Sequence, residues 1–260
     1  MSRARWLARE LGPPLVGVAG VIVVWAVAAA ATDTAAIPSP AVVWSAFLDG
    51  MRDGSIPEAA LKTLIRLAFS FVVAVTLGVL LGLLLALSGF ARRAIRPLVV
   101  ALQITPFVAW VPLAVIWFGA SERAVVFVAI VGSFPAMTLA TIQAIRQVPP
   151  LYERTGRTLG AAGWTLYRSV VFPAAMPGVM AGLQQAWGFA WKALMAGEVI
   201  VTAASAHEGL GHLIGRPGAS VPTLLAALAV ILMIGVAADY LLFGQLDRRI
   251  RRRRGLLVEA

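Results

Sequence analysis

The two histidines of the chain could bind a metal only if their spacing let both imidazoles converge. Both lie in the segment HEGLGH, at His207 and His212. Zinc proteases carry HExxH, in which the two histidines are four residues apart and share one face of a helix. Here they are five residues apart with two glycines between them. The spacing does not fit a zinc site, and we expect no metal.

Motifs for covalent or nucleotide chemistry are absent from the sequence as well. It contains no GxSxG elbow for a serine nucleophile, no GxxxxGK[ST] phosphate loop and no cysteine. An intramembrane hydrolase would need an assembled nucleophile, base or set of metal ligands. We therefore expect a protein that is not an enzyme and has no cofactor.

One face of the apolar segment 178–201 carries side chains that would be poorly placed against lipid. Spacings of +3, +7, +11 and +14, at 100° per residue, put them within about 60° of arc. Lys192 is turned by about 240° from Glu198, so these two charges are not a local ion pair. The face is a candidate translocation path, with plain helix or dimer packing as the alternative. Its members are Gln184, Trp187, Trp191, Met195 and Glu198.

Two prolines interrupt the apolar segment 97–119. Pro106 and Pro112 remove backbone donors, so we expect the backbone here to be bent or broken. A break of this kind is tolerated where neighbouring helices or a water-lined cavity satisfy the freed carbonyls. Pro106 and Trp110 are therefore candidates for the wall of a pathway, and an ordinary packed kink is the alternative.

A polar segment, 146–168, separates two apolar ones. Its pieces PLYERTGRTLGA and AGWTLYRSVV both have helical composition and meet at the glycines of LGAAG. This pattern predicts a helix, a glycine turn and a second short helix. Leu159 and Trp164 would suit a protein partner, and a merely structural loop is the alternative. Pro173 and Pro177 are expected to redirect the chain into the next span.

Composition places these segments in a membrane. Of the 260 residues, 60% are hydrophobic and 13% charged, outside the usual range of soluble domains. A hydrocarbon core about 30 Å thick needs about 20 apolar residues of helix, and six segments qualify. We predict an all-α polytopic protein with one transmembrane domain over 1–260. The predicted spans are 13–31, 64–87, 97–119, 124–145, 178–201 and 221–243.

The basic residues predict the orientation of these spans. Of 22 lysines and arginines, 16 lie before the first span, between the second and third, between the fourth and fifth, or after the sixth. This split follows the positive-inside rule if the first span is retained and both termini are cytoplasmic. The net charge of +10 therefore reflects topology, and we expect membrane lipid, not nucleic acid, as a partner.

Three smaller patterns concern helix packing and helix ends. Gly78 and Gly82 form a small-xxx-small pair that allows close helix approach. Ser39 and Pro40 predict the start of a short helix, which lies either in the outer interface or packed on the bundle. Asp239, near the inner end of the sixth span, is expected at the interface.

The chain resembles the binding-protein-dependent ABC importer permeases, and within them the nitrate/sulfonate/taurine branch. The cytoplasmic-loop signature and the helix after it correspond to RTLGAAGWTLYRSVVFPAAMPGVMAGLQQAWGFAWKALMAGEVI. The likeness runs over about 37–247 and includes, in order, IPSP, TLIRLAFSF, ITPFVAWVPLAVIWFGAS, FPAM and GLGHLI.

The resemblance implies a six-span permease of the methionine-importer-like fold in the bacterial inner (plasma) membrane. It implies four kinds of partner: two ABC ATPase subunits, a second copy of the chain, an external solute-binding protein and a small-molecule solute. The loop helix would dock on an ATPase subunit, and closure of the ATPase pair on ATP would switch the pathway from inward to outward facing. The implied solute is a small organic anion such as an aliphatic sulfonate, taurine or nitrate.

The resemblance also implies a coupling surface on the loop. The family has Glu-Ala-Ala beginning six residues before the loop glycine, which is Gly160 here, and this chain departs from that pattern. Arg154, Thr155 and Gly156 stand in those places, with Glu153 one residue earlier. The implied coupling residues are Arg154, Thr155, Gly156, Leu159, Gly160, Ala161, Ala162 and Trp164.

A stand-alone carrier driven by an ion or proton gradient is the alternative function. Such a carrier would need carboxylates near the bilayer midplane and usually repeated halves. Neither is evident in the sequence.

Overall fold

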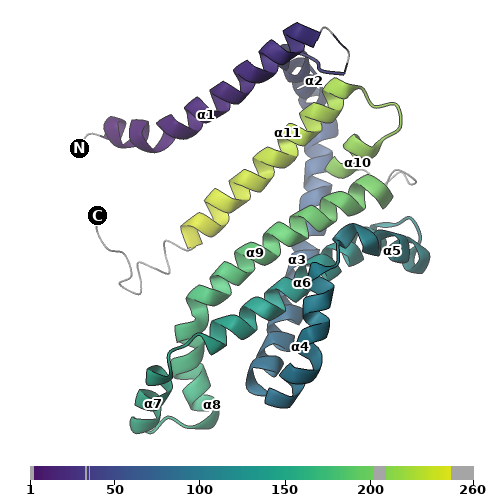
Figure 1. Ribbon diagram of the computed structural model, residues 1–260. Coiled ribbons are helices and arrows are strands. Elements are labelled where there is room, and N and C mark those ends of the chain that lie inside the picture. The colour runs from purple at the N-terminus through teal and green to yellow at the C-terminus, as the bar shows by residue number, and fades with distance from the viewer. Residues whose placement is uncertain (1–2, 33, 35, 202–208, 247–260) are drawn as a thin grey trace.

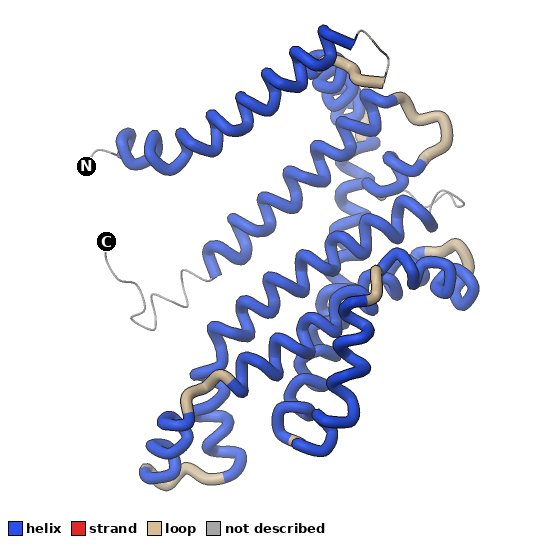
Figure 2. Tube along the Cα trace, in the orientation of Figure 1, coloured by secondary structure: helices blue, strands red, loops and turns tan. Residues whose placement is uncertain are grey.

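The structure is a computed structural model that describes residues 3–32, 34, 36–201 and 209–246. Every regular element in these ranges is helical (Figure 2), which confirms the all-α class. The elements are α1 (Arg3–Thr32), α2 (Pro40–Arg52), α3 (Ser55–Leu87), α4 (Gly89–Ile104), η1 (Phe107–Trp110), α5 (Val111–Phe118), α6 (Glu122–Arg146), α7 (Pro150–Thr158), α8 (Gly163–Leu166), η2 (Tyr167–Val171), α9 (Phe172–Val201), α10 (Leu210–Gly215), α11 (Val221–Ala237) and η4 (Ala238–Phe243).

Several of these helices are long and apolar enough to cross a membrane. Five qualify by themselves, and a bent pair brings the number to six if it counts as one span. This agrees with the expected number of spans, although α3 begins at Ser55, well before the predicted start of the second span. Figure 1 shows α9, α11 and α6 running side by side through the body of the molecule, with the loop helices α7 and α8 at one end.

Helix α6 forms the centre of the bundle and packs against both α3 and α9. Small residues allow the α3 contact. A Cβ added to Gly78 would lie 2.6 Å from the Cβ of Met137, and one added to Gly82 would lie 2.6 Å from the Cβ of Thr141. Both glycines are therefore part of the α3–α6 interface, as the small-residue pair predicted.

The prolines break the third predicted span into two helices. The chain bends by 99° between α4 and the stretch Phe107–Phe118, which comprises η1 and α5, so a bent or broken backbone is confirmed. Thr105 is extended, with ψ 126°, because a residue before proline is pushed out of the helical region. Pro106 then precedes η1, and Pro112 lies in the first turn of α5, where its missing donor is tolerated.

The short helix α2 begins where the sequence predicted and packs on the bundle. Ser39 occupies the N-cap position of α2 and Pro40 its first turn, as predicted, although the Ser39 hydroxyl makes no capping hydrogen bond. Helix α2 packs on α11 and α3, and Val43 is buried there. The packed alternative for this helix therefore describes the structure better than a free interfacial one.

The connection from the loop into the fifth span is more continuous than predicted. Gly163–Val201 form a single helical run that passes through Pro173 and Pro177 without a break. The turns over Tyr167–Val171 are π-helical. A wider π turn accommodates the Pro173 ring and its missing donor, where a regular α turn would place a carbonyl against the ring. Pro173 and Pro177 therefore lie inside one continuous helical run, and a redirection of the chain at these two prolines stays a prediction.

Candidate functional site

A compact projection at one end of the bundle is formed by α7, the turn after it and α8, and we call residues 150–166 the knob (Figure 1). The turn has the hydrogen bonds of a Schellman motif: the Ala161 amide donates to the Gly156 carbonyl at 3.0 Å, and the Gly160 amide to the Arg157 carbonyl at 3.0 Å. Gly160 has φ +85°, a left-handed conformation that glycine adopts at least cost. The predicted helix, glycine turn and second helix are present.

The knob presents large apolar side chains outward. Leu159 is 83% exposed and Trp164 is 64% exposed. Trp164 is held edge-on to Phe172, with ring centroids 5.8 Å apart, so its ring is anchored on one side only. Arg154, Thr155 and Ala162 are exposed as well. Exposed apolar side chains on a rigid turn are typical of a surface that meets another protein.

Gly156, where the resembling family has an alanine, is the one buried member of the expected coupling surface. A Cβ there would lie 2.7 Å from Leu166 Cδ1 and 3.1 Å from Val170 Cγ2. Glycine lets α7 pack directly on the second half of the knob. Glu153, one place before the expected glutamate, lies 3.9 Å from Arg157 in an exposed pair within α7. The departure from Glu-Ala-Ala therefore places a buried glycine and an exposed arginine where the resembling family has an alanine and a glutamate.

The polar and aromatic face of α9 is divided among three environments. At its start, the exposed Gln184 donates from Nε2 to Asp239 Oδ1 at 2.5 Å, which ties α9 to η4. In the middle, Trp187 lies edge-on to Phe71 at 5.3 Å and tilted against Phe243 at 5.9 Å. Farther along, Trp191 and Met195 pack at the edge of the core.

Glu198 ends this face in a buried charge network. Its side chain is 0% exposed. Arg66 Nη1 donates to Oε1 at 2.9 Å, and the Thr63 hydroxyl and the Gly211 amide donate to Oε2 at 2.8 and 3.0 Å. Thr63 Oγ1 in turn accepts from the Leu210 amide at 2.9 Å. The carboxylate thus joins α3, α9 and the first residues of α10.

Arg66 extends the network to a fourth helix. Its Nη2 donates to Glu122 Oε1 at 2.6 Å, at the first residue of α6. One buried guanidinium therefore bridges two carboxylates from different helices. A paired charge of this kind is tolerated inside the protein because both partners keep their hydrogen bonds.

The glycines of HEGLGH are explained by the same network. A Cβ at Gly209 would lie 2.6 Å from both Glu198 oxygens, so only glycine lets the chain approach the carboxylate. His212 lies on α10, and His207 is outside the described residues. The segment that superficially matched a zinc motif serves, in its described part, to seat α10 on Glu198.

Sequence reasoning identified Glu198 but not its partners. Thr63 and Arg66 lie 135 and 132 residues away from it along the chain. Helical periodicity gives the face of a residue on its own helix and says nothing about which helix lies opposite. A usable signal was present, because an arginine inside an apolar span needs a partner.

Two adjoining cavities flank the carboxyl end of α6. One has a volume of about 550 Å³ and is lined by Arg92, Arg93, Arg96 and Pro97 of α4 and by Ile142, Gln143, Arg146 and Gln147. The other has about 490 Å³ between α6 and α9 and includes four glutamines, Gln143, Gln147, Gln184 and Gln185. Gln143 and Gln147 line both. In the sequence, Arg92, Arg93, Arg96 and Arg146 served only to predict the orientation of the spans in the membrane.

Most of the chain, from within α3 to beyond η4, matches the model of a known protein family. The family model described as binding-protein-dependent transport system inner membrane component matches residues 74–252. The chain belongs to this family. It is accordingly a permease subunit of the ABC importer class and a multi-pass protein of the inner (plasma) membrane.

Several characterised relatives are similar over most of their length. The bicarbonate transport system permease CmpB of Synechococcus elongatus is 28% identical, covering 77% of this chain and 75% of that one. The taurine transport system permease TauC of Escherichia coli is 28% identical over 71% and 66%. The nitrate import permease NrtB of Synechocystis is 26% identical over 87% and 84%.

Two solved structures share the fold of this permease. The MetNI methionine ABC transporter, in an inward-facing conformation, has a TM-score of 0.62 at 17% identity and covers 74% of this chain and 94% of that one. An amino acid ABC transporter has a TM-score of 0.61 at 20% identity and covers 78% and 98%. At this identity the likeness shows the fold alone, and it confirms the predicted methionine-importer-like architecture.

Proposed function

We propose that this permease forms the solute pathway of an ATP-driven importer for a small anion of the sulfonate, taurine or nitrate kind. It would work as a pair of identical chains with two separate ATPase subunits and an external solute-binding protein, with both termini in the cytoplasm. The observation that carries the proposal is the knob, because Leu159 and Trp164 are exposed on a turn fixed by two backbone hydrogen bonds. A rigid apolar projection can transmit a displacement from a docked partner to α9.

The class of solute rests on the relatives and on the glutamine-lined cavity. The relatives are named for the transport of bicarbonate, taurine and nitrate, which are all small and carry an anionic group. Gln143, Gln147, Gln184 and Gln185 supply amide donors between α6 and α9. Neutral donors can hold an anion without binding it too tightly for release.

Affinity purification of the tagged chain from its native membrane tests the partnership. The proposal expects a nucleotide-binding ATPase subunit to co-purify in a one-to-one ratio with the permease. Recovery of the chain as a complete, active unit without any ATPase would favour the gradient-driven carrier.

Replacement of Trp187 by alanine tests whether the polar and aromatic face of α9 takes part in transport. We expect Trp187→Ala to reduce uptake several-fold while the complex still assembles, because the indole fixes α9 against Phe71 and Phe243. Trp44→Ala is the matched control, since Trp44 is largely exposed on α2 and distant in sequence. Uptake and gel-filtration profiles would be measured together. Wild-type uptake in Trp187→Ala would assign the face to packing.

A further inference from the structure

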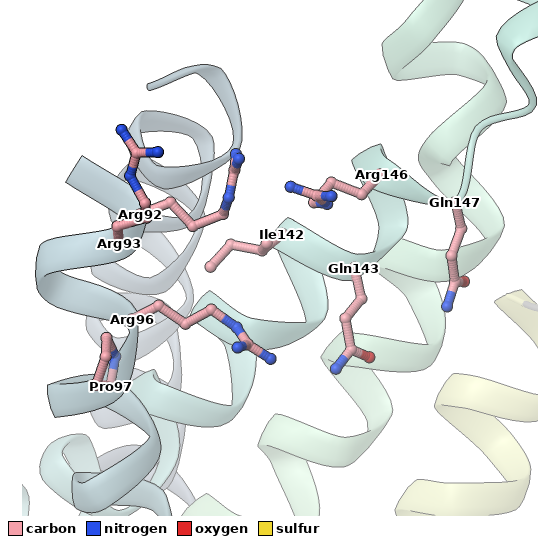
Figure 3. A pocket seen from close by; sticks show the side chains of 8 residues that line it. All are labelled: Arg92, Arg93, Arg96, Pro97, Ile142, Gln143, Arg146 and Gln147. Carbon is pink, nitrogen blue, oxygen red and sulfur yellow. The ribbon is translucent and has the colours of Figure 1, made fainter. Parts of the chain in front are cut away.

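The arginine-lined cavity beside α6 holds more positive charge than the described chain neutralises. Arg93, Arg96 and Arg146 make no ion pair with any carboxylate in the described ranges. Figure 3 shows Arg96 extending from α4 toward α6, and Arg146 extending from α6 toward α4, with Ile142 between the two helices. The guanidinium groups thus come from two helices and approach a shared space.

Helix geometry adds to this positive potential. Arg92, Arg93 and Arg96 lie in the first two turns of α4, which begins at Gly89. A helix amino terminus is itself the positive end of the helix dipole, so cations there are unfavourable unless an anion is present. Arg92 is partly relieved, because its Nη1 donates to the Leu85 and Ala86 carbonyls at 3.4 Å each. The other three arginines have no such acceptor within the described residues.

The residues around the cavity have the composition that suits a membrane surface. Helix α3 ends at Leu87, so the arginines come directly after a span. Phe90, 78% exposed, and Leu98, 64% exposed, flank them on α4. An apolar groove of about 420 Å³ is lined by Leu77, Leu80, Leu81, Leu84 and Phe134.

The groove and the cavity are linked by packing. Leu81 lines the groove and also packs against the cluster that contains Ile142, a wall residue of the arginine cavity. A charged recess next to an apolar groove matches the two parts of a phospholipid. Basic pockets between transmembrane helices on the cytoplasmic side recognise anionic headgroups.

We propose that this cavity binds the phosphate group of an anionic phospholipid of the inner leaflet, with Arg93, Arg96 and Arg146 as its ligands. Guanidinium groups are suited to phosphate because their paired N–H donors match two phosphate oxygens. The bound headgroup would hold α4 to the carboxyl end of α6. This role does not depend on the knob, although the cavity shares Gln143 and Gln147 with the glutamine-lined one.

Titration of the purified full-length chain in a neutral detergent with short-chain phosphatidylglycerol tests the proposal, with short-chain phosphatidylcholine as the neutral probe. Each arginine near a headgroup contributes about fivefold in affinity. The variant Arg93→Gln/Arg96→Gln/Arg146→Gln is expected to bind phosphatidylglycerol roughly 100-fold more weakly. Arg92 is kept because it caps carbonyls of α3.

The matched control removes three other arginines, as Arg52→Gln/Arg123→Gln/Arg216→Gln, all exposed and all outside the cavity. It should keep wild-type affinity. Unchanged elution volume and circular dichroism would establish that each variant is folded. Equal loss of affinity in both variants, or no loss in either, would overturn the proposal.

Two further measurements distinguish a bound lipid from other possible occupants of the cavity. Inorganic phosphate that binds the purified chain, with phosphatidylglycerol unable to displace it, would assign the site to free phosphate and overturn the lipid source. Normal lipid binding by the cavity variant, together with loss of ATPase co-purification, would assign the arginines to an acidic protein surface instead. Lipid binding lost with ATPase co-purification retained is the result that the proposal expects.

Discussion

Replacement of Arg66 by leucine is expected to destabilise the permease by about 3–5 kcal/mol, because it leaves the Glu198 carboxylate buried without its counter-charge. Glu122 would lose the same partner. The expected readouts are a lower unfolding temperature in detergent and reduced recovery of folded protein. Thr63 and the Gly211 amide would still donate to Glu198, so what is lost is the positive charge together with the one hydrogen bond from Arg66 Nη1.

Arg52→Leu is the matched control for this change. Arg52 lies on α2 and pairs with Asp49 at 3.5 Å, but both side chains are largely exposed. Exposed pairs contribute only about 0–1 kcal/mol, so this variant should unfold near the wild-type temperature. The double variant Arg66→Leu/Glu198→Met should recover part of the loss, because α9 then no longer buries a carboxylate without its counter-charge. Equal stability of Arg66→Leu and Arg52→Leu would contradict the network as a source of stability.

Gly160→Asp is expected to abolish transport and ATPase association while the protein still inserts into the membrane. The substitution places a charge on the exposed apolar tip of the knob, beside Leu159. A non-glycine residue in the left-handed conformation costs about 1–2 kcal/mol, which is a local cost at the turn. No atom lies within 4 Å of a Cβ at this position, so the side chain itself makes no clash.

Gly218→Asp provides a control at a glycine with nearly the same backbone conformation and the same open surroundings. Gly218 has φ +79° against +85° for Gly160, and a Cβ there also meets nothing within 4 Å. It lies between α10 and α11, far along the chain from the knob. Strain and added charge are thus matched, and only the location differs. Uptake in cells and ATPase co-purification would be measured for both, and normal values in Gly160→Asp would remove the knob from the mechanism.

The sequence contained enough local information to predict the knob and the broken third span. Gly160 predicted a helix end because a left-handed residue closes a Schellman turn, and Pro106 predicted a break because it constrains the residue before it. Both effects act within a few residues. The π turn before Pro173 was missed, because a proline can be accommodated by a wider turn as well as by a bend.

The parts that could not be predicted depend on contacts between distant segments. Periodicity placed these side chains on one face of α9, but the division of that face into an exposed Gln184, a packed Trp187 and a buried Glu198 depends on η4, Phe71 and Arg66. The arginine-lined cavity could not be predicted from the sequence for the same reason. Arg146 and Arg96 are 50 residues apart, and only the packing of α4 on α6 brings their side chains to one space.

Solute uptake into liposomes that contain the permease with its ATPase subunits, supplied with the external binding protein, tests the central claim most directly. Labelled taurine, nitrate and bicarbonate would be offered in turn. We predict uptake of a small anion only when ATP is present on the ATPase side, with no uptake by the permease alone under a proton or sodium gradient. Gradient-driven uptake by the permease alone, unaffected by ATP, would contradict this account.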